Sequence, residues 1–391
     1  MESANRRRSY AHASEFFFFF IVLVIRSRDA LDRIPADPGY DYIYSSAKNG
    51  IESLSQGDPY FHLAARLISL LAAQFPIELQ ALTQSLMTHV IWALCAVGFS
   101  RVIFLETSRR FIGTVSGLLL VTAPHASESS LGNVGNVKWP LTLLLVVICS
   151  SSKFTTLHQR TSLFIAVIVG LSQPLAVLAM TGPLYRWVHN RAITKIERSL
   201  LAVLGLALVV QIFKVGLVGV ASGRAAKVTD PWEGMGIFWW SGLLGPMLIS
   251  VVNIILILIY RRRTSGAELV VLLSVHALVF GVMNYLLGGI ADRYFVLPMT
   301  LSLVAALLGL ALTLPIARST RKLLMTLFIA GLAIPSMKWF SVGWYLTTGP
   351  TWRDEISRAR TICGNAVDVA ETLLITADGK IELPCEYVRH D

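Results

Sequence analysis

Six acidic side chains occur in the polar segment 26–76, which follows the first apolar run of the chain: Asp29, Asp32, Asp37, Asp41, Glu52 and Asp58. The later apolar runs carry almost no carboxylates. A carboxylate beside a membrane can accept a proton from a hydroxyl group, whereas a proton-driven transporter needs acidic groups inside its helices. The distribution of acids therefore favours chemistry at the membrane surface.

Two of these acids stand in patterns that suit a general base. Asp41 lies in Gly39-Tyr40-Asp41-Tyr42, where the two aromatic rings could stack on a sugar while the carboxylate accepts a hydroxyl proton. Asp58 precedes an amphipathic helix predicted over residues 60–75. A solvated loop acid and a helix N-cap are the structural alternatives. We predict that Asp41 or Asp58 is the base, and the choice between them stays open.

Several other polar residues could hold an anionic lipid head group. His62 and Arg66 are four residues apart and share one face of the predicted helix. Arg293 and Tyr294 begin a late apolar run, where an arginine can form bidentate hydrogen bonds to a phosphate and the tyrosine adds a donor. Snorkelling and anchoring at the interface are the alternative roles of such residues. Further candidates on the same membrane face are Glu128, Asn133 and Asn136.

Two ionisable residues fall inside predicted spans. Lys214 and His276 are costly in a membrane, so each is predicted to be paired, to snorkel or to take part in function.

The composition defines the class of protein whose elements must position these residues. The chain has 391 residues, of which 54% are hydrophobic and 15% charged, and its mean hydropathy is +0.62. These values predict an all-α polytopic membrane protein. The net charge of +10 comes largely from Lys and Arg in short breaks between apolar runs. This arrangement is typical of cytoplasmic loops, so we expect no nucleic-acid partner.

The apolar runs predict about 9–11 transmembrane helices. Besides a first run at 16–25, they cover 81–105, 111–123, 137–150, 200–220, 238–260, 267–287, 294–316 and 323–335. The segment 162–185 is broken at Ser172-Gln173-Pro174 and is predicted to form a hairpin of two short helices. A hairpin keeps the later basic loops on the cytoplasmic side, in agreement with the positive-inside rule.

The basic residues also predict the orientation. Arg6, Arg7 and Arg8 precede the first apolar run, so we expect a cytoplasmic N-terminus and an outer position for the loop 26–76. The transmembrane domain then covers residues 1–337, and an outer tail covers 338–391. Cys363 and Cys385 in this tail could form a disulfide, which persists in oxidising compartments and would contribute about 3 kcal/mol. The end of the tail, 375–386, is strand-like.

These features resemble the GT-C superfamily of polytopic glycosyltransferases. The likeness in layout is to small bacterial members, and it rests on segments 60–67 and 132–139 and on the tail with Cys363 and Cys385. The run Asp58-Pro59-Tyr60-Phe61 also looks like a run in oligosaccharyltransferase catalytic subunits. The first loop has no adjacent acidic pair, unlike the pattern of the superfamily. That departure leaves the catalytic acid and any divalent metal open.

The resemblance implies a polyprenyl-phosphate sugar donor and a glycan, lipid or protein acceptor, on the outer face of a bacterial plasma membrane or of the endoplasmic reticulum. We expect an inverting transfer in which the base deprotonates the acceptor and polyprenyl phosphate leaves. A metal would help this reaction but is not required. The rival functions are a membrane transporter or lipid-linked-glycan flippase, and a non-catalytic membrane scaffold.

Overall fold

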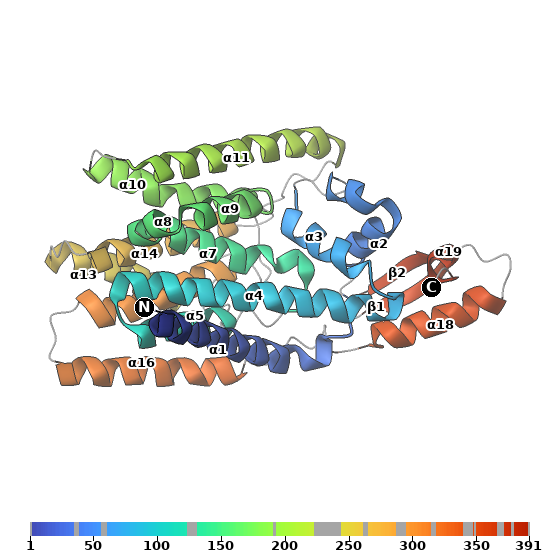
Figure 1. The fold of residues 1–391 in the computed structure, drawn as a ribbon, viewed down its shortest axis with the longest axis horizontal. Coiled ribbons are helices and arrows are strands. Elements are labelled where there is room, and N and C mark those ends of the chain that lie inside the picture. Colours follow the sequence, from blue (N-terminus) through green and yellow to red (C-terminus); the bar gives the residue numbers. More distant parts are fainter. Residues whose placement is uncertain are drawn as a thin grey trace.

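The chain folds into a bundle built mainly of helices, with a small disulfide-bonded tail at one end (Figure 1). The computed structural model describes residues 2–34, 39–55, 61–122, 131–190, 193–222, 244–260, 265–286, 295–313, 318–338, 347, 349–365, 371–376 and 379–389. Within these residues, three helices are long and apolar enough to cross a membrane, and they lie at Ile77–Thr107, Lys195–Gly216 and Gly266–Met283. The predicted helical, membrane-type fold is thus confirmed in this general form, while the span count remains a prediction.

The predicted apolar spans coincide closely with observed helices. They correspond to α1 (Glu2–Ser27), α4 (Ile77–Thr107), α5 (Arg110–Thr122), α7 (Lys138–Ser150), α11 (Lys195–Ser222), α13 (Leu244–Tyr260), α14 (Ser265–Leu286), α15 (Val296–Leu308) with the π-helix η6 (Gly309–Thr313), and α16 (Arg318–Lys338). The central helices α4, α7 and α15 carry the largest share of fully buried apolar side chains, among them Trp92 and Trp139. Burial of such side chains is the dominant favourable term in packing the bundle.

The segment predicted to be a hairpin is interrupted where expected. After α8 (Ser152–Leu157), α9 (Gln159–Gly170) ends just before Ser172, and the 3-10 helix η4 (Pro174–Met180) leads into α10 (Thr181–Asn190). The Leu171 carbonyl accepts a hydrogen bond from Leu63 N at 3.3 Å, beside α3 (Leu63–Ala72). Arg186 in α10 instead donates to the Ser150 carbonyl at the far end of α7, at 3.2 Å. The chain therefore runs along the bundle and back.

The acid-rich first segment is largely helical rather than an open loop. It contains the 3-10 helix η1 (Arg28–Ala30), α2 (Gly39–Asn49), the 3-10 helix η2 (Gly50–Ser55) and α3. The amphipathic helix predicted over 60–75 is shorter in the structure, where α3 covers only Leu63–Ala72. A turn at 73–75 follows it, and Pro76 is the N-cap of α4. The next polar segment contributes the 3-10 helix η3 (Val134–Asn136), which packs against α3.

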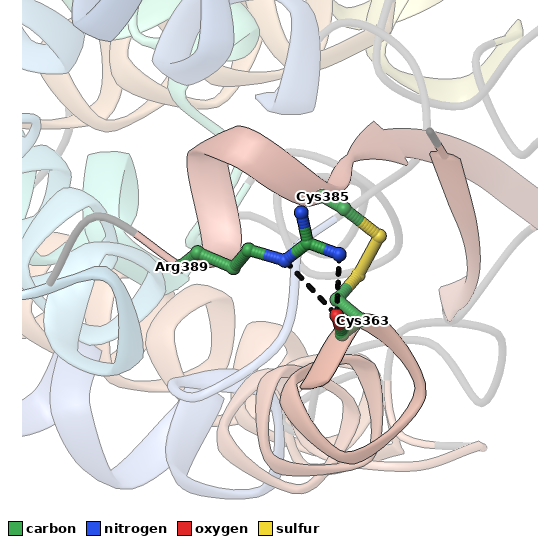
Figure 2. Close-up of a disulfide and its surroundings, with 3 residues drawn as sticks. All are labelled: Cys363, Cys385 and Arg389. Atoms are coloured by element: carbon green, nitrogen blue, oxygen red, sulfur yellow. Dashed lines mark hydrogen bonds between the residues drawn. A yellow bond between two sulfur atoms is a disulfide. The ribbon is translucent and has the colours of Figure 1, made fainter. Parts of the chain in front are cut away.

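The tail consists of α18 (Trp352–Asn365), an antiparallel hairpin of β1 (Glu371–Thr376) and β2 (Gly379–Pro384), and α19 (Cys385–Arg389). Glu371 pairs with Pro384 and Thr376 with Gly379. The predicted disulfide between Cys363 and Cys385 is present, and Arg389 Nε donates to the Cys363 carbonyl at 2.9 Å (Figure 2). The strand-like character expected at 375–386 is confirmed in β2 and the end of β1.

A small apolar core joins this tail to the first segment. Trp352, Ile356 and Leu383 of the tail pack with Ile43 of α2 and Ile77 of α4. Trp352 Nε1 also donates to the Ile77 carbonyl at 2.6 Å. The tail, α2 and α3 consequently lie together at one end of the bundle (Figure 1).

A charged network lies at the opposite end. The buried Arg186 donates to Glu197 Oε1 at 2.5 Å and to the Cys149 carbonyl at 2.8 Å, and it lies 3.9 Å from Glu268. Glu106 accepts a hydrogen bond from Ser151 at 2.6 Å in the same region. These contacts join the ends of α4, α7, α10, α11 and α14.

Candidate functional site

The first two helices of the acid-rich segment meet at a buried trio of Tyr42, His62 and Arg66. The rings of Tyr42 and His62 are 5.7 Å apart, and the Arg66 guanidinium carbon lies 4.9 Å from the centre of the Tyr42 ring. Arg66 Nη1 donates to the Ser53 carbonyl at 2.6 Å. His62 lies just before α3 and Arg66 lies within it, and both approach the Tyr42 ring, so the predicted placement of His62 on the helix itself is wrong.

A lysine from α11 joins this group. Lys214 Nζ lies 4.6 Å from the centre of the Phe61 ring and donates to the Ser55 carbonyl. Gln211, one turn earlier on α11, accepts from Phe61 N at 2.8 Å and donates to the Gly170 carbonyl at 3.0 Å. These bonds hold the residue preceding His62 against α11. Lys214, which the sequence placed inside a span, is therefore associated with the first segment.

A second lysine comes from the start of α7. Lys138 Nζ lies 5.2 Å from the centre of the Trp139 ring, whose Nε1 donates to Asn136 Oδ1 at 3.1 Å. Asn133 caps η3 by accepting from Gly135 N at 2.9 Å. Gly132, with φ of +76°, makes the turn before η3 in a conformation that favours glycine.

Three positive charges from described residues act on His62. Burial lowers the pKa of this imidazole to about 2, and the charges of Lys138, Arg66 and Lys214 contribute in the same direction. An imidazole with so low a pKa is neutral at pH 7, so the positive charge at this place belongs to Arg66, Lys138 and Lys214. We call Arg66, Lys138 and Lys214 the cationic cluster, since all three charges act on His62.

The cationic cluster has the chemistry of an anion site. Lys138 and Lys214 are partly exposed, whereas His62 and Arg66 are only 6% and 3% exposed. The two lysines therefore lie nearer to solvent than His62 and Arg66 do. Lys138 is also the first residue of α7, where the helix dipole adds positive potential. Such an arrangement suits a phosphate group at the boundary of the bundle.

The candidate base Asp41 lies next to this site in the chain. Its side chain is exposed in the first turn of α2, while the neighbouring Tyr42 is buried against His62 and Arg66. The Tyr42 ring is therefore committed to protein packing and is not open to stack on a sugar, contrary to the sequence expectation. The exposed carboxylate remains accessible to a hydroxyl group from solvent.

The other predicted site residues divide into two groups. Asn133 and Asn136 are buried and make the internal bonds that shape η3, so they position Lys138. Asp58, Glu128, Arg293 and Tyr294 lie outside the described residues. Among the residues that the structure describes, no group of three or more His, Cys, Asp or Glu side chains could hold a metal ion.

The sequence did not single out Lys138 as a ligand. The signal that could have identified it was the pair of segments 60–67 and 132–139, which the resemblance had already grouped and which the structure places in contact through α3 and η3. In comparisons with known proteins, no family model and no curated protein matches the chain.

Proposed function

We propose that this chain is a multi-pass membrane glycosyltransferase with about 9–11 spans, which transfers a sugar from a polyprenyl-phosphate donor to an envelope acceptor. In this proposal the N-terminus is cytoplasmic, and the first segment and the tail lie outside a bacterial plasma membrane. The observation that carries the proposal is the cationic cluster, which gathers Arg66, Lys138 and Lys214 from three helices around the neutral His62.

The surface of α11 supports a lipid-linked substrate. Leu206, Val209 and Phe213 are exposed at helical spacing and lead along α11 towards Lys214. A prenyl chain could pack along this apolar stripe while its phosphate contacts Lys214. Since α11 is one of the three helices long and apolar enough to cross a membrane, this stripe would face the lipid, and a prenyl chain beside it would bring its phosphate near Lys214.

The proposed reaction uses one base and one phosphate site. Asp41, or Asp58 in its place, takes the proton of the acceptor hydroxyl, whose oxygen forms a bond to the anomeric carbon. The bond between that carbon and the phosphate oxygen breaks, and its electron pair leaves on the polyprenyl phosphate. The cationic cluster stabilises the charge that develops on the phosphate, and Arg293 with Tyr294 complete the donor site.

A binding experiment tests the donor site. Purified protein in lipid nanodiscs is titrated with polyprenyl phosphate, and Lys214→Met is expected to weaken binding about tenfold or more because a charge-assisted contact is lost. Lys138→Met should have an effect of similar size. Lys195→Met is the matched control, since Lys195 is exposed at the other end of the same helix. Equal affinities of Lys214→Met and Lys195→Met would remove the cationic cluster from its role.

A turnover experiment tests the base. Transfer from a labelled polyprenyl-phosphate sugar should fall by about 10²–10⁴-fold in Asp41→Asn if this carboxylate is the base. Glu52→Gln is the control, because Glu52 is another exposed acid of the first segment. Full turnover in both Asp41→Asn and Asp58→Asn would show that neither acid has this function.

A further inference from the structure

A cavity lies where the tail meets the first segment, and none of Arg66, Lys138 and Lys214 lines it. It has a volume of about 680 Å³ and is lined by α2, by the corner between α3 and α4, and by α19. Binding sites for small molecules commonly occupy about 300–1,000 Å³. We call this cavity the tail groove.

The tail groove is lined by aromatic rings. Tyr44 and Tyr387 meet edge to face with their centres 5.6 Å apart, and Phe75 is 44% exposed on the wall formed by the α3–α4 corner. Aromatic rings offer flat, weakly polar faces that pack against the C–H surface of a sugar ring. Partly exposed rings in a concave site are unfavourable in water unless a ligand covers them.

Neutral hydrogen-bonding groups stand beside these rings. Gln80 accepts from the Tyr387 hydroxyl at 2.8 Å and donates to the Phe75 carbonyl at 3.1 Å, so its amide is fixed in orientation. Gln74 is exposed on the same wall. Gln80 is only 3% exposed and so orients the Tyr387 hydroxyl, whereas the exposed Gln74 amide can both donate and accept, as the hydroxyl groups of a carbohydrate require.

The described residues that line the tail groove include one charge of each sign. Lys48 and Glu386 both line it, one from α2 and one from α19. A site with one charge of each sign and several amide and phenol groups favours a neutral, hydroxyl-rich ligand over a phosphate or an acidic one.

We propose that the tail groove binds a neutral oligosaccharide. This inference goes beyond the proposed transferase activity: it assigns a glycan ligand to a separate site, and that ligand would be the acceptor if the transferase proposal is correct. The groove exists only when the tail is docked, since α19 forms one of its walls. The tail is held there by the Trp352–Ile77 bond, by the Tyr387–Gln80 bond and by the ion pair of Arg360 with Glu78.

The test measures binding and not turnover, so that it can fail independently of the proposed transferase activity. The full chain in nanodiscs, free of sugar-based detergent, is titrated with neutral tri- and hexasaccharides of mannose, glucose and arabinose by saturation-transfer NMR. At least one probe should bind saturably. Phe75→Ala should weaken that binding by up to about tenfold, because an aromatic contact is removed.

Two controls locate the bound glycan. Leu71→Ala should leave binding unchanged, since Leu71 is 56% exposed and one turn before Phe75 but does not line the groove. The Lys214→Met variant should also bind the saccharide normally, because Lys214 belongs to the cationic cluster and does not line the tail groove. The proposal is overturned if no saccharide binds saturably, if Leu71→Ala weakens binding as much as Phe75→Ala, or if Lys214→Met abolishes it. Saturable binding of a neutral hexapeptide in place of every saccharide would also overturn it.

Discussion

The guanidinium of Arg66 lies over the ring of Tyr42, and its central carbon is 4.9 Å from the ring centre. The same group donates through Nη1 to the Ser53 carbonyl at 2.6 Å. A lysine cannot make both contacts, because its ammonium is compact and lacks the planar fork. Arg66→Lys should therefore lower the free energy of unfolding by about 1–2 kcal/mol, measured by denaturant titration in detergent. Arg198→Lys, at an exposed site, is the control. Equal losses in the two variants would contradict the role of Arg66.

His62 gives a pH-dependent prediction. The unfolded chain protonates this imidazole near pH 6.5, whereas the native pKa is lowered to about 2, so the unfolded state binds more protons between these values. The free energy of unfolding should therefore decrease as the pH falls below 6.5. The contribution of His62 to this decrease is about 1.4 kcal/mol for each pH unit.

His62→Gln should remove this part of the pH dependence, because glutamine does not titrate. Unfolding free energies of wild type and variant are compared between pH 7.5 and about 4.5, the range over which an unperturbed histidine takes up its proton. The difference between the two curves isolates His62 from other groups. Parallel curves for wild type and His62→Gln would show that the native imidazole titrates normally.

The sequence predicted the positions of the helices better than the contacts between them. Apolar runs and breaks placed α4, α5, α7 and the interruption after Gly170 within a few residues, because length and hydropathy are local properties. The pairing of Cys363 with Cys385 followed from their shared position in a polar tail. The approach of Lys138 and Lys214 to His62 depends on how η3 and α11 pack against the first segment. Lys138 and Lys214 follow His62 by 76 and 152 positions, and a single sequence does not indicate that folding brings residues so far apart together.

The buried pair of Arg186 and Glu197 should be strongly coupled. Arg186 Nε and Glu197 Oε1 are 2.5 Å apart, and both side chains are almost fully buried. Arg186→Met would leave the Glu197 carboxylate without its partner and should cost about 3–5 kcal/mol of unfolding free energy. The additional change Glu197→Gln should recover part of this loss, because it removes the buried charge. If the double variant lost the sum of the two single losses, the pair would not be coupled.

The Trp352 indole hydrogen bond is one of the contacts that dock the tail. Trp352→Phe keeps a large ring in the small core but leaves the Ile77 carbonyl without its 2.6 Å donor. The loss of one such hydrogen bond costs about 0.5–1.5 kcal/mol. Hydrogen exchange of the amides in α18 should therefore become faster, while exchange in α7 should stay unchanged. Equal protection of α18 in both proteins would mean that apolar contacts alone hold the tail.

The disulfide should also stabilise the folded, docked tail. Cys363 and Cys385 enclose the strand hairpin and are 22 residues apart, so their bond is expected to contribute about 3 kcal/mol to the folded tail. Replacing both by serine should make residues 349–389 sensitive to limited proteolysis and should weaken saccharide binding in the tail groove, because α19 carries one wall.

Treatment of the wild type with dithiothreitol should reproduce both effects, since it breaks the same bond. Cys95→Ala is the control, because Cys95 is a free thiol buried in α4. A tail that stays protease-resistant and binds saccharide after reduction would show that the Trp352 and Tyr387 contacts suffice to hold it.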